Sequence, residues 1–355
     1  MEYPKFKVTV SCMTYNQSKY ITDAMNGFTM QQTSFPYVCT IVDDASTDGE
    51  QEVIHQYVEE NFDFSEGSVA YHKETDYAHI TYAQHKTNKN CYFAVLYLKE
   101  NHYSQKKDKK PYIKEWRDSV EYMAICEGDD YWIVSDKLEM QVNFLDKNEN
   151  YGLVYTRTQH LFTTNQLVNE VILNHCDTKS LLKSNPIRTL TVLLRNNLYK
   201  QYTDYTINVF QYNYDYPMFL WFSYYSKIKY FDKITGVYRI LANSASHSDN
   251  PYNVYKFQET CLNVRKHWAE IVGLDISVYE YDYLRLCYYY AFKRSDEKGL
   301  INYRKKMISF NKTHKCLFRD AIIYFGNCDI LISKILQLFL PLYRKFKYYF
   351  YSVNR

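Results

Sequence analysis

Three carboxylates stand together at residues 127–130, where Glu127, Gly128, Asp129 and Asp130 directly follow a short apolar run. A short apolar run that ends in charge is typical of a buried strand, so its end would bring these carboxylates to one edge of a sheet. Clustered carboxylates repel one another unless a cation lies among them, and Mg2+ and Mn2+ prefer oxygen ligands. The motif therefore predicts a divalent metal site. The alternative is an acidic turn that caps the next helix.

Two other predicted strands also end in polar residues. Residues 8–14 lead into Thr14-Tyr15-Asn16, and residues 37–42 lead into Asp43 and Asp44. In sheets of parallel strands, ligands bind beyond the carboxyl ends of the strands. We therefore expect the three strand ends to form one site, where Gly128 lets the backbone come close to something bulky or take a conformation closed to other residues.

Strand and helix patterns alternate through the first 155 residues, which favours an α/β domain with a mainly parallel sheet. Further strands are predicted at residues 69–72, 92–98, 122–126 and 151–155, and helices at about 18–32, 50–61 and 138–145. Ser18 is expected to cap the first helix. Residues 74–90 receive no assignment.

The second half of the chain continues with other elements. The pattern predicts a strand at 187–195, an apolar helix at 218–225, a β-ribbon at 228–240 and helices from about residue 252 onward. We expect a catalytic domain over residues 1–248 and a helical region over residues 249–355.

Composition excludes several classes of protein. The net charge of +3 over 355 residues is too small to indicate nucleic-acid binding. The nine cysteines are scattered and never spaced C-x-x-C, which favours reduced core residues in a cytoplasmic protein over a disulfide framework or a zinc site. The N-terminus lacks the apolar core of a signal peptide, and no run of eighteen apolar residues occurs. A dinucleotide-binding fingerprint and a P-loop are absent too.

Several motifs appear in a consistent order between residues 6 and 247. They are Thr14-Tyr15-Asn16, DDASTDG at 43–49, EGDDYW at 127–132, Tyr214-Asp215-Tyr216, GVYR at 236–239 and Ser246-His247. Together they resemble the family 2 glycosyltransferases of bacteria, which are inverting enzymes of the GT-A type. One position departs from the family pattern, because Glu127 stands where the metal motif usually begins with Asp.

The resemblance implies transfer of a sugar from a nucleotide diphosphate to an acceptor hydroxyl. It implies that Asp215 is the catalytic base and that Asp129 binds Mg2+ or Mn2+. Further candidate metal ligands are Glu127, Asp130 and His247. The donor would contact a larger set of residues, namely Thr14, Tyr15, Asn16, Asp44, Gly128 and Asp129. Asp44 is expected to meet the base, because the family uses this position against uracil, so the donor would be a UDP-sugar.

Each of these roles has a structural alternative. Asp215 lies before an apolar helix and would serve as its cap. Asp130 would instead hydrogen-bond the donor sugar or cap the following helix, and Tyr15 would pack in the core. His247, in a polar loop, would be an ordinary surface residue. Lys106 and Lys107 would reach the diphosphate, although a lysine-rich loop is more often simply solvated.

The end of the chain has a pattern of its own. Polar residues in 330–347 fall on one helical face, and residues 340–355 are basic and aromatic without any acid. This pattern is typical of a helix on an anionic membrane surface, although Pro341 would kink it. A helix packed on the catalytic domain is the alternative. The membrane reading would place the enzyme on the inner face of the plasma membrane, with a saccharide or lipid-linked acceptor.

Two other functions compete with this hypothesis. A sugar nucleotidyltransferase would need a glycine-rich basic loop after the first strand, which residues 14–17 do not provide. A binding module that lost catalysis would not need to keep both Asp129 and Asp215. We therefore expect a metal-dependent glycosyltransferase of cell-surface polysaccharide or glycolipid synthesis.

Overall fold

The computed structural model describes residues 4–170, 176–209, 215–241 and 250–314 of the chain. The chain divides into two compact units, Met1–Ile240 and Leu241–Arg355. The boundary predicted at residue 248 lies in 242–249, outside the described residues.

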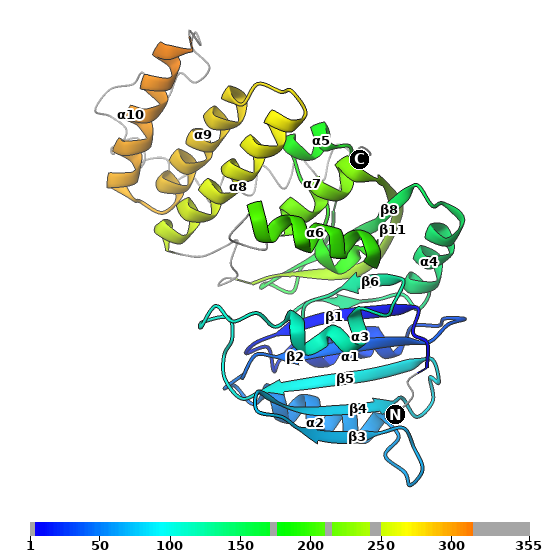
Figure 1. Ribbon diagram of the computed structural model, residues 1–355. Coiled ribbons are helices and arrows are strands. Elements are labelled where there is room, and N and C mark those ends of the chain that lie inside the picture. The colour runs from blue at the N-terminus through cyan, green and yellow to red at the C-terminus, as the bar shows by residue number, and fades with distance from the viewer. Residues whose placement is uncertain (1–3, 171–175, 210–214, 242–249, 315–355) are drawn as a thin grey trace. The chain divides into compact units, whose positions relative to one another are not determined.

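Four parallel strands form the centre of the first unit. They are β1 (Val8–Thr14), β2 (Tyr37–Asp43), β5 (Cys91–Leu98) and β6 (Tyr122–Ile125), in the spatial order β5-β2-β1-β6 (Figure 1). Every residue of β2 and β5 is buried, because both faces of the sheet are covered. The predicted α/β architecture with a mainly parallel sheet is therefore confirmed.

The remaining strands extend the sheet on both sides. On one side lie β4 (Ala78–Gln84) and β3 (Tyr71–Glu74). On the other lie β10 (Leu193–Arg195), β8 (Tyr151–Phe162), β11 (Lys227–Ile240) and β7 (Tyr131–Trp132), with β9 (Leu167–Asn169) beside β8. Strand β4 occupies the stretch that received no assignment from the sequence.

Two predicted strands in the second half were wrong in detail. Residues 187–195 contain the 3-10 turn η2 (Thr189–Thr191) before the short β10. The turn arises because Leu190 and Thr191 offer their carbonyls to Trp132 Nε1 at 2.7 Å and Gln141 Nε2 at 2.8 Å, which a continuous strand would not allow. Residues 228–240 form one long strand parallel to β8, not a β-ribbon, since its partner comes from residues 151–162.

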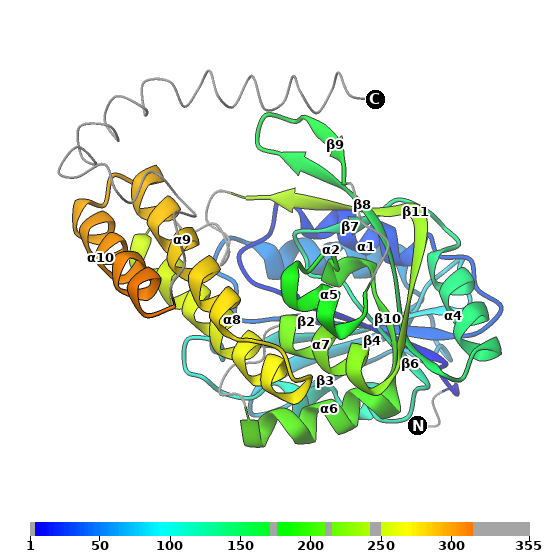
Figure 2. The ribbon, with the colours of Figure 1, turned by 90° about the horizontal axis from the view of Figure 1, so that it is seen from above.

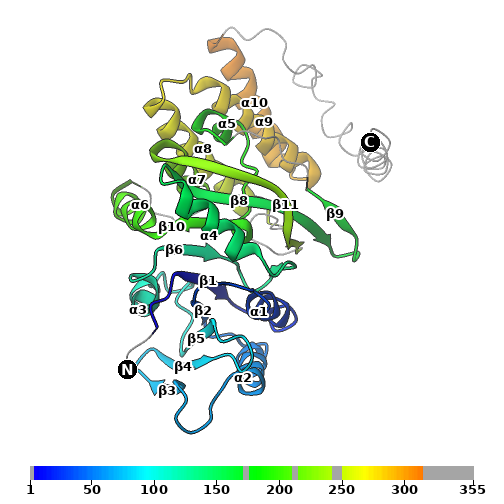
Figure 3. The ribbon, with the colours of Figure 1, turned by 90° about the vertical axis from the view of Figure 1, so that its right-hand side faces the viewer.

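Helices cover the two faces of the sheet with separate cores. One face packs against α1 (Ile21–Thr29), α2 (Glu50–Asn61) and α4 (Lys137–Lys147). The other packs against η1 (Lys110–Ile113) and α3 (Lys114–Arg117), and Figure 3 shows α1 and α2 opposite α3. The unit also contains α5 (Thr178–Lys183), α6 (Asn196–Val209) and α7 (Asp215–Tyr225).

The predicted cap of the first helix is wrong. Helix α1 begins at Ile21 with Tyr20 at its N-cap position and no side-chain cap. Ser18 instead donates its backbone N–H to Asp48 Oδ2 at 3.0 Å. The turn before α1 is therefore tied to the loop that follows β2.

The second unit is helical, as predicted. Its described part comprises α8 (Pro251–Ile271), α9 (Ser277–Lys293) and α10 (Glu297–Thr313), which lie side by side in Figure 2. Asn250 caps α8, and a small core of Tyr281, Leu284, Cys287, Tyr303 and Met307 joins α9 to α10. In the described residues, no helix has the length and apolar character needed to cross a membrane. The basic tail lies outside them.

Candidate functional site

The three polar strand ends meet at one edge of the sheet, as the sequence predicts. Thr14 of β1 pairs with Asp43 of β2 in the parallel register. Beyond β6, the backbone continues beside β1, because Gly128 N donates to Met13 O at 3.3 Å. The carboxyl ends of β1, β2 and β6 therefore form a single polar edge.

Gly128 makes this close approach possible. A Cβ atom at this position would collide with Thr14 Oγ1 and lie 2.6 Å from Gln17 Oε1. Any larger residue would push the acidic turn, residues 127–130, away from the end of β1. Gly128 therefore shapes the site through its backbone, which is the close approach that the sequence analysis expected.

Glu50 organises the same edge, and the sequence analysis missed it. Its fully buried carboxylate accepts hydrogen bonds from Thr14 Oγ1, from Gln17 N at 2.8 Å and from Ser46 Oγ at 2.8 Å. Burial raises the pKa of Glu50. A Glu in the first turn of a helix normally faces solvent, so only its position directly after DASTDG could have singled it out.

Asn16 and Tyr15 extend from this network. Asn16, in the left-handed region at φ 55°, donates its backbone N–H to Ser46 Oγ at 2.9 Å and accepts from Thr47 N at 2.8 Å. Tyr15 as a residue is 45% exposed. This exposure opposes the alternative that Tyr15 packs in the core, and leaves its ring open to a ligand.

Asp44 has protein partners on both of its oxygens. Oδ1 accepts the His102 backbone N–H at 2.8 Å, while Oδ2 accepts the Tyr103 backbone N–H at 3.0 Å and Lys109 Nζ at 2.8 Å. The Asp44 side chain is only 3% exposed. Asp44 therefore anchors the loop that follows β5, and its expected contact with the base stays a prediction.

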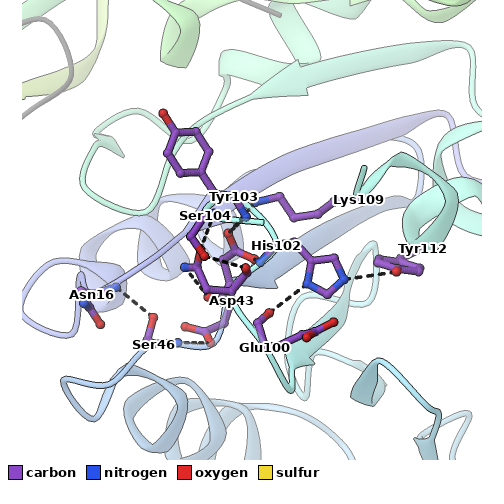
Figure 4. Close-up of polar contacts among 11 residues, drawn as sticks. Asn16, Asp43, Ser46, Glu100, His102, Tyr103, Ser104, Lys109 and Tyr112 are labelled. Atoms are coloured by element: carbon purple, nitrogen blue, oxygen red, sulfur yellow. Dashed lines mark hydrogen bonds and ion pairs between the residues drawn. The ribbon is translucent and has the colours of Figure 1, made fainter. Parts of the chain in front are cut away.

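Figure 4 shows how this loop is built around the end of β2. His102 is itself buried, with Nδ1 2.9 Å from Glu100 O and Nε2 3.2 Å from the Tyr112 hydroxyl. Tyr103 stands out, because its side chain is 81% exposed. The buried Asp43 uses Oδ1 to accept from Ser46 N at 3.0 Å and Gln51 Nε2 at 2.6 Å.

The carboxyl groups of the acidic turn, residues 127–130, have fewer hydrogen-bond donors around them than Asp44 has. Burial and the charges of Asp215 and Asp129 raise the pKa of Glu127 to about 8, and Thr189 Oγ1 donates to Glu127 Oε2 at 3.1 Å. Burial also raises the pKa of Asp129, although a hydrogen bond from Gln17 and the charge of Arg239 oppose the shift. These carboxylates are crowded and short of donors, which is the condition that a cation relieves.

Asp130 has a different environment. It is 3% exposed, and its Oδ1 accepts the backbone N–H of Arg239 at 2.8 Å. Burial and the neighbouring charge of Asp129 raise its pKa well above the usual range. Asp130 thus connects the acidic turn to β11, a structural role that neither sequence alternative named. Its role as a metal ligand stays a prediction.

Asp215 lies near the acidic turn although it comes from a different part of the chain. It is the first residue of α7. Although solvent reaches part of this residue, the protein packed around it desolvates the carboxyl group and raises its pKa to about 6. Its charge acts on Glu127, so the two carboxylates share one region. Next to it, the Tyr216 hydroxyl donates to Leu181 O at 3.0 Å and ties the start of α7 to α5.

The residues present fit a hard divalent ion in part. The ligand atoms at the acidic turn are carboxylate oxygens, which suit Mg2+ or Mn2+. No group of three or more His, Cys, Asp or Glu side chains in the described part of the chain could hold a metal ion by itself. An ion here would therefore need further ligands, such as substrate phosphates. His247 and Tyr214 lie outside the described residues.

Comparisons with known proteins support the fold and leave the family open. No family model matches the chain. Uncharacterized proteins of Mycobacterium bovis and Mycobacterium tuberculosis are 30% identical over 141 residues, which is 40% of this chain and 32% of theirs. The chain thus matches about a third of the length of these curated relatives.

Solved structures match over most of the chain. The crystal structure of residues 1–349 of S. aureus TarS has a TM-score of 0.50 at 14% identity, and covers 92% of this chain and 89% of that one. The same protein in complex with UDP-GlcNAc has a TM-score of 0.51 at 14% identity with the same coverage. The predicted GT-A fold with C-terminal helices is therefore confirmed.

Proposed function

We propose that this chain is an inverting glycosyltransferase that moves a sugar from a UDP-sugar to a saccharide or lipid-linked hydroxyl. The observation that carries the proposal is the acidic turn, with Glu127 and Asp129, at the carboxyl edge of a GT-A sheet, close enough to Asp215 for its charge to act on Glu127. Ligands of such sheets bind at that edge. A structure with the same fold is a complex with UDP-GlcNAc.

The acceptor side of the reaction depends on Asp215. Its carboxylate takes the proton of the acceptor hydroxyl as the oxygen attacks the anomeric carbon, and the bond from that carbon to the diphosphate breaks. Attack from the face opposite the leaving group inverts the anomeric configuration. A pKa of about 6 leaves Asp215 ionised at neutral pH, while desolvation makes it a stronger base than an ordinary Asp.

The donor side depends on the acidic turn. Asp129, with Glu127 beside it, would hold Mg2+ or Mn2+ together with the donor diphosphate. When bound, the ion supplies positive charge against the negative charge that develops on the leaving group. Gly128 keeps the turn against Thr14 and Gln17 after β1, and so fixes where Asp129 meets the donor diphosphate.

The nucleoside would lie over the ends of β1 and β2. The exposed ring of Tyr15 is available for stacking on the base, and Asn16 fixes the backbone beneath it. Asp44 would select uracil by accepting from its ring N–H. Calorimetry with UDP and GDP tests this choice, and tighter binding of GDP would overturn it.

The experiment that tests the function is a panel of nucleotide sugars. UDP-glucose, UDP-GlcNAc and GDP-mannose are added to the purified chain with and without Mn2+, and its melting temperature is followed. A bound ligand at a hundred times its Kd stabilises the folded state by about 2.7 kcal/mol. We expect a UDP-sugar with Mn2+ to raise the melting temperature most, with slow release of UDP.

The outcomes separate the competing functions. Stabilisation without any UDP release, even with acceptor saccharides present, would favour a binding module that has lost catalysis. No stabilisation by any nucleotide sugar would overturn the proposal. Formation of UDP-sugar from a sugar phosphate and UTP would instead identify a nucleotidyltransferase.

The acceptor and the membrane role remain part of the proposal. A basic amphipathic tail at 330–347 would bring the enzyme to a lipid-linked acceptor on an anionic membrane. Flotation of the full chain and of a chain ending at Tyr324 on anionic vesicles tests the tail. Equal flotation of both would remove the membrane from the proposal.

A further inference from the structure

We propose that Arg239 is a positioning residue that holds the acidic turn, residues 127–130, against α1 and β11 and thereby sets where Asp129 lies. This inference rests on the proposed function for its consequence in catalysis. Its structural part, the fixing of the turn, can be tested without that function.

The first observation is the set of contacts that Arg239 makes. It is the next-to-last residue of β11, and its backbone N–H donates to Asp130 Oδ1 at 2.8 Å. Its Nη1 donates to the backbone carbonyl of Asp129 at 2.6 Å, and its Nη2 forms an ion pair with Asp23 of α1. One side chain therefore connects three separate elements at the turn.

The second observation is the aromatic surroundings of the guanidinium. Its carbon lies 5.0 Å from the centre of the Tyr20 ring and 4.5 Å from the centre of the Tyr131 ring. Both distances are within the range of about 6 Å for cation–π attraction. Arg239 is 8% exposed, so these contacts are made with little competition from water.

The geometry requires an arginine and not only a positive charge. A planar guanidinium can stack on rings while its edge donates in several fixed directions, and an ammonium group cannot reproduce this combination. Arg239 also holds Asp129 by its backbone carbonyl and not by its carboxylate. The Asp129 side chain is thus oriented without being used up as a partner of the arginine.

The consequence for catalysis follows from the position of the turn. A misplacement of about 1 Å at a reacting group can cost about a hundredfold in rate. A loose turn would move Asp129, and with it any ion and diphosphate that Asp129 holds. We expect the turnover number to suffer more than the acceptor KM, because the acceptor contacts Asp215 on another element.

Two variants and one control test the inference. Arg239→Lys keeps the positive charge and loses the planar guanidinium with its several N–H donors. Asp23→Asn removes only the ion pair to α1, in which the Asp23 side chain is 52% exposed. The control is Lys233→Met, on the same strand as Arg239, which breaks the exposed ion pair between Lys233 and Asp136 at the start of α4. Hydrogen exchange of the peptide containing residues 127–132 is measured in each folded protein.

The expected result is graded. Arg239→Lys should speed exchange at the turn, lower kcat by about thirtyfold, and weaken binding of Mn2+ as followed by its EPR signal, while the acceptor KM changes little. Asp23→Asn should change exchange, kcat and Mn2+ binding in the same direction but only a few-fold, since exposed ion pairs contribute little to stability. Lys233→Met should match the wild type in all three measurements.

Wild-type exchange at the turn in both variants would overturn the inference. If Arg239→Lys fails to fold, Asp23→Asn alone decides, because its effect on the turn is predicted in the same direction. If the wild type binds neither Mn2+ nor any nucleotide sugar, the proposed function fails. Hydrogen exchange then still shows whether Arg239 holds the turn, so the two failures are distinguishable.

Discussion

Two acidic strand ends lie at the same edge of the sheet and differ in how their charges are satisfied. After β2, Asp44 is buried and receives two backbone N–H groups and an ammonium group. After β6, Glu127 is half-buried with one hydroxyl donor, and desolvation with neighbouring carboxylates raises its pKa to about 8. The first end stabilises a loop, whereas the second leaves carboxyl groups that are short of protein donors and that a ligand can satisfy.

The difference teaches that residue type and strand position do not decide the role of a carboxylate. What decides it is how many donors the rest of the chain brings. The loop after β5 brings Lys109 to Asp44, while no ammonium or guanidinium group in the described part of the chain pairs with the Glu127 carboxylate. A carboxylate short of donors in a desolvated place is a candidate for function.

An Asp-to-Asn substitution is predicted to act differently after β6, at Asp129, and after β2, at Asp44. The largest effect is expected at Asp129. Asp129→Asn removes the charge that would hold the ion, and we expect the transfer rate to fall on the order of a thousandfold. The melting temperature should hold or rise, since burial already penalises this charge. Sugar transfer with and without EDTA is the measurement. Full activity of the variant in EDTA would show that Asp129 is not a metal ligand.

Asp215→Asn tests whether the partner of the acidic turn is the base. The amide keeps the size of the side chain but cannot accept a proton, so kcat should fall about a hundredfold or more. Donor affinity, measured by calorimetry, should stay the same if Asp215 is the base, because a base acts on the acceptor. If Asp215 serves only as a helix cap, the variant stays active, since Asn caps as well as Asp.

Asp44→Asn should show the opposite of Asp129→Asn: the folded protein should lose stability and keep most of its transfer rate. The amide leaves Lys109 without its ion pair and turns an NH2 group toward one of the backbone donors. We expect a loss of about 2 kcal/mol in the free energy of unfolding, measured with denaturant. The rate at saturating donor should change little. Because the proposed function has Asp44 meet the base, UDP affinity should also fall in the folded variant, and an unchanged affinity would remove Asp44 from the donor site.

Glu127→Gln should change the stability of the fold by an amount that depends on pH. The pKa of Glu127 is raised in the folded state, so the folded protein keeps a proton that the unfolded chain releases. The wild type therefore loses stability as pH rises from the ordinary range of a Glu to about 8, and Gln does not.

The melting temperatures of wild type and Glu127→Gln in EDTA, at pH 5 and at pH 8.5, check this sign. The variant should be the more stable protein at the higher pH and close to the wild type at the lower one. An equal difference at both values would mean that Glu127 ionises normally, and the contrast between the two strand ends would weaken.

Local pattern was enough to predict the central fold and the place of the site. Residues 8–14, 37–42 and 122–126 are short runs of strand formers, and each meets its parallel neighbour in the structure. The polar residues that follow them then have to lie at one edge, because parallel strands end on the same side. The convergence of Thr14, Asp43 and the acidic turn needed no further information.

Tertiary structure alone decided which side chains are satisfied there. Asp44 meets Lys109 from 65 positions away, and Arg239 meets Asp23 from 216 positions away. The burial of Glu50 and the turn at 189–191 likewise depend on residues remote in the chain. Strand pattern is a property of neighbours, whereas the supply of hydrogen-bond donors to a buried carboxylate is a property of the packed chain.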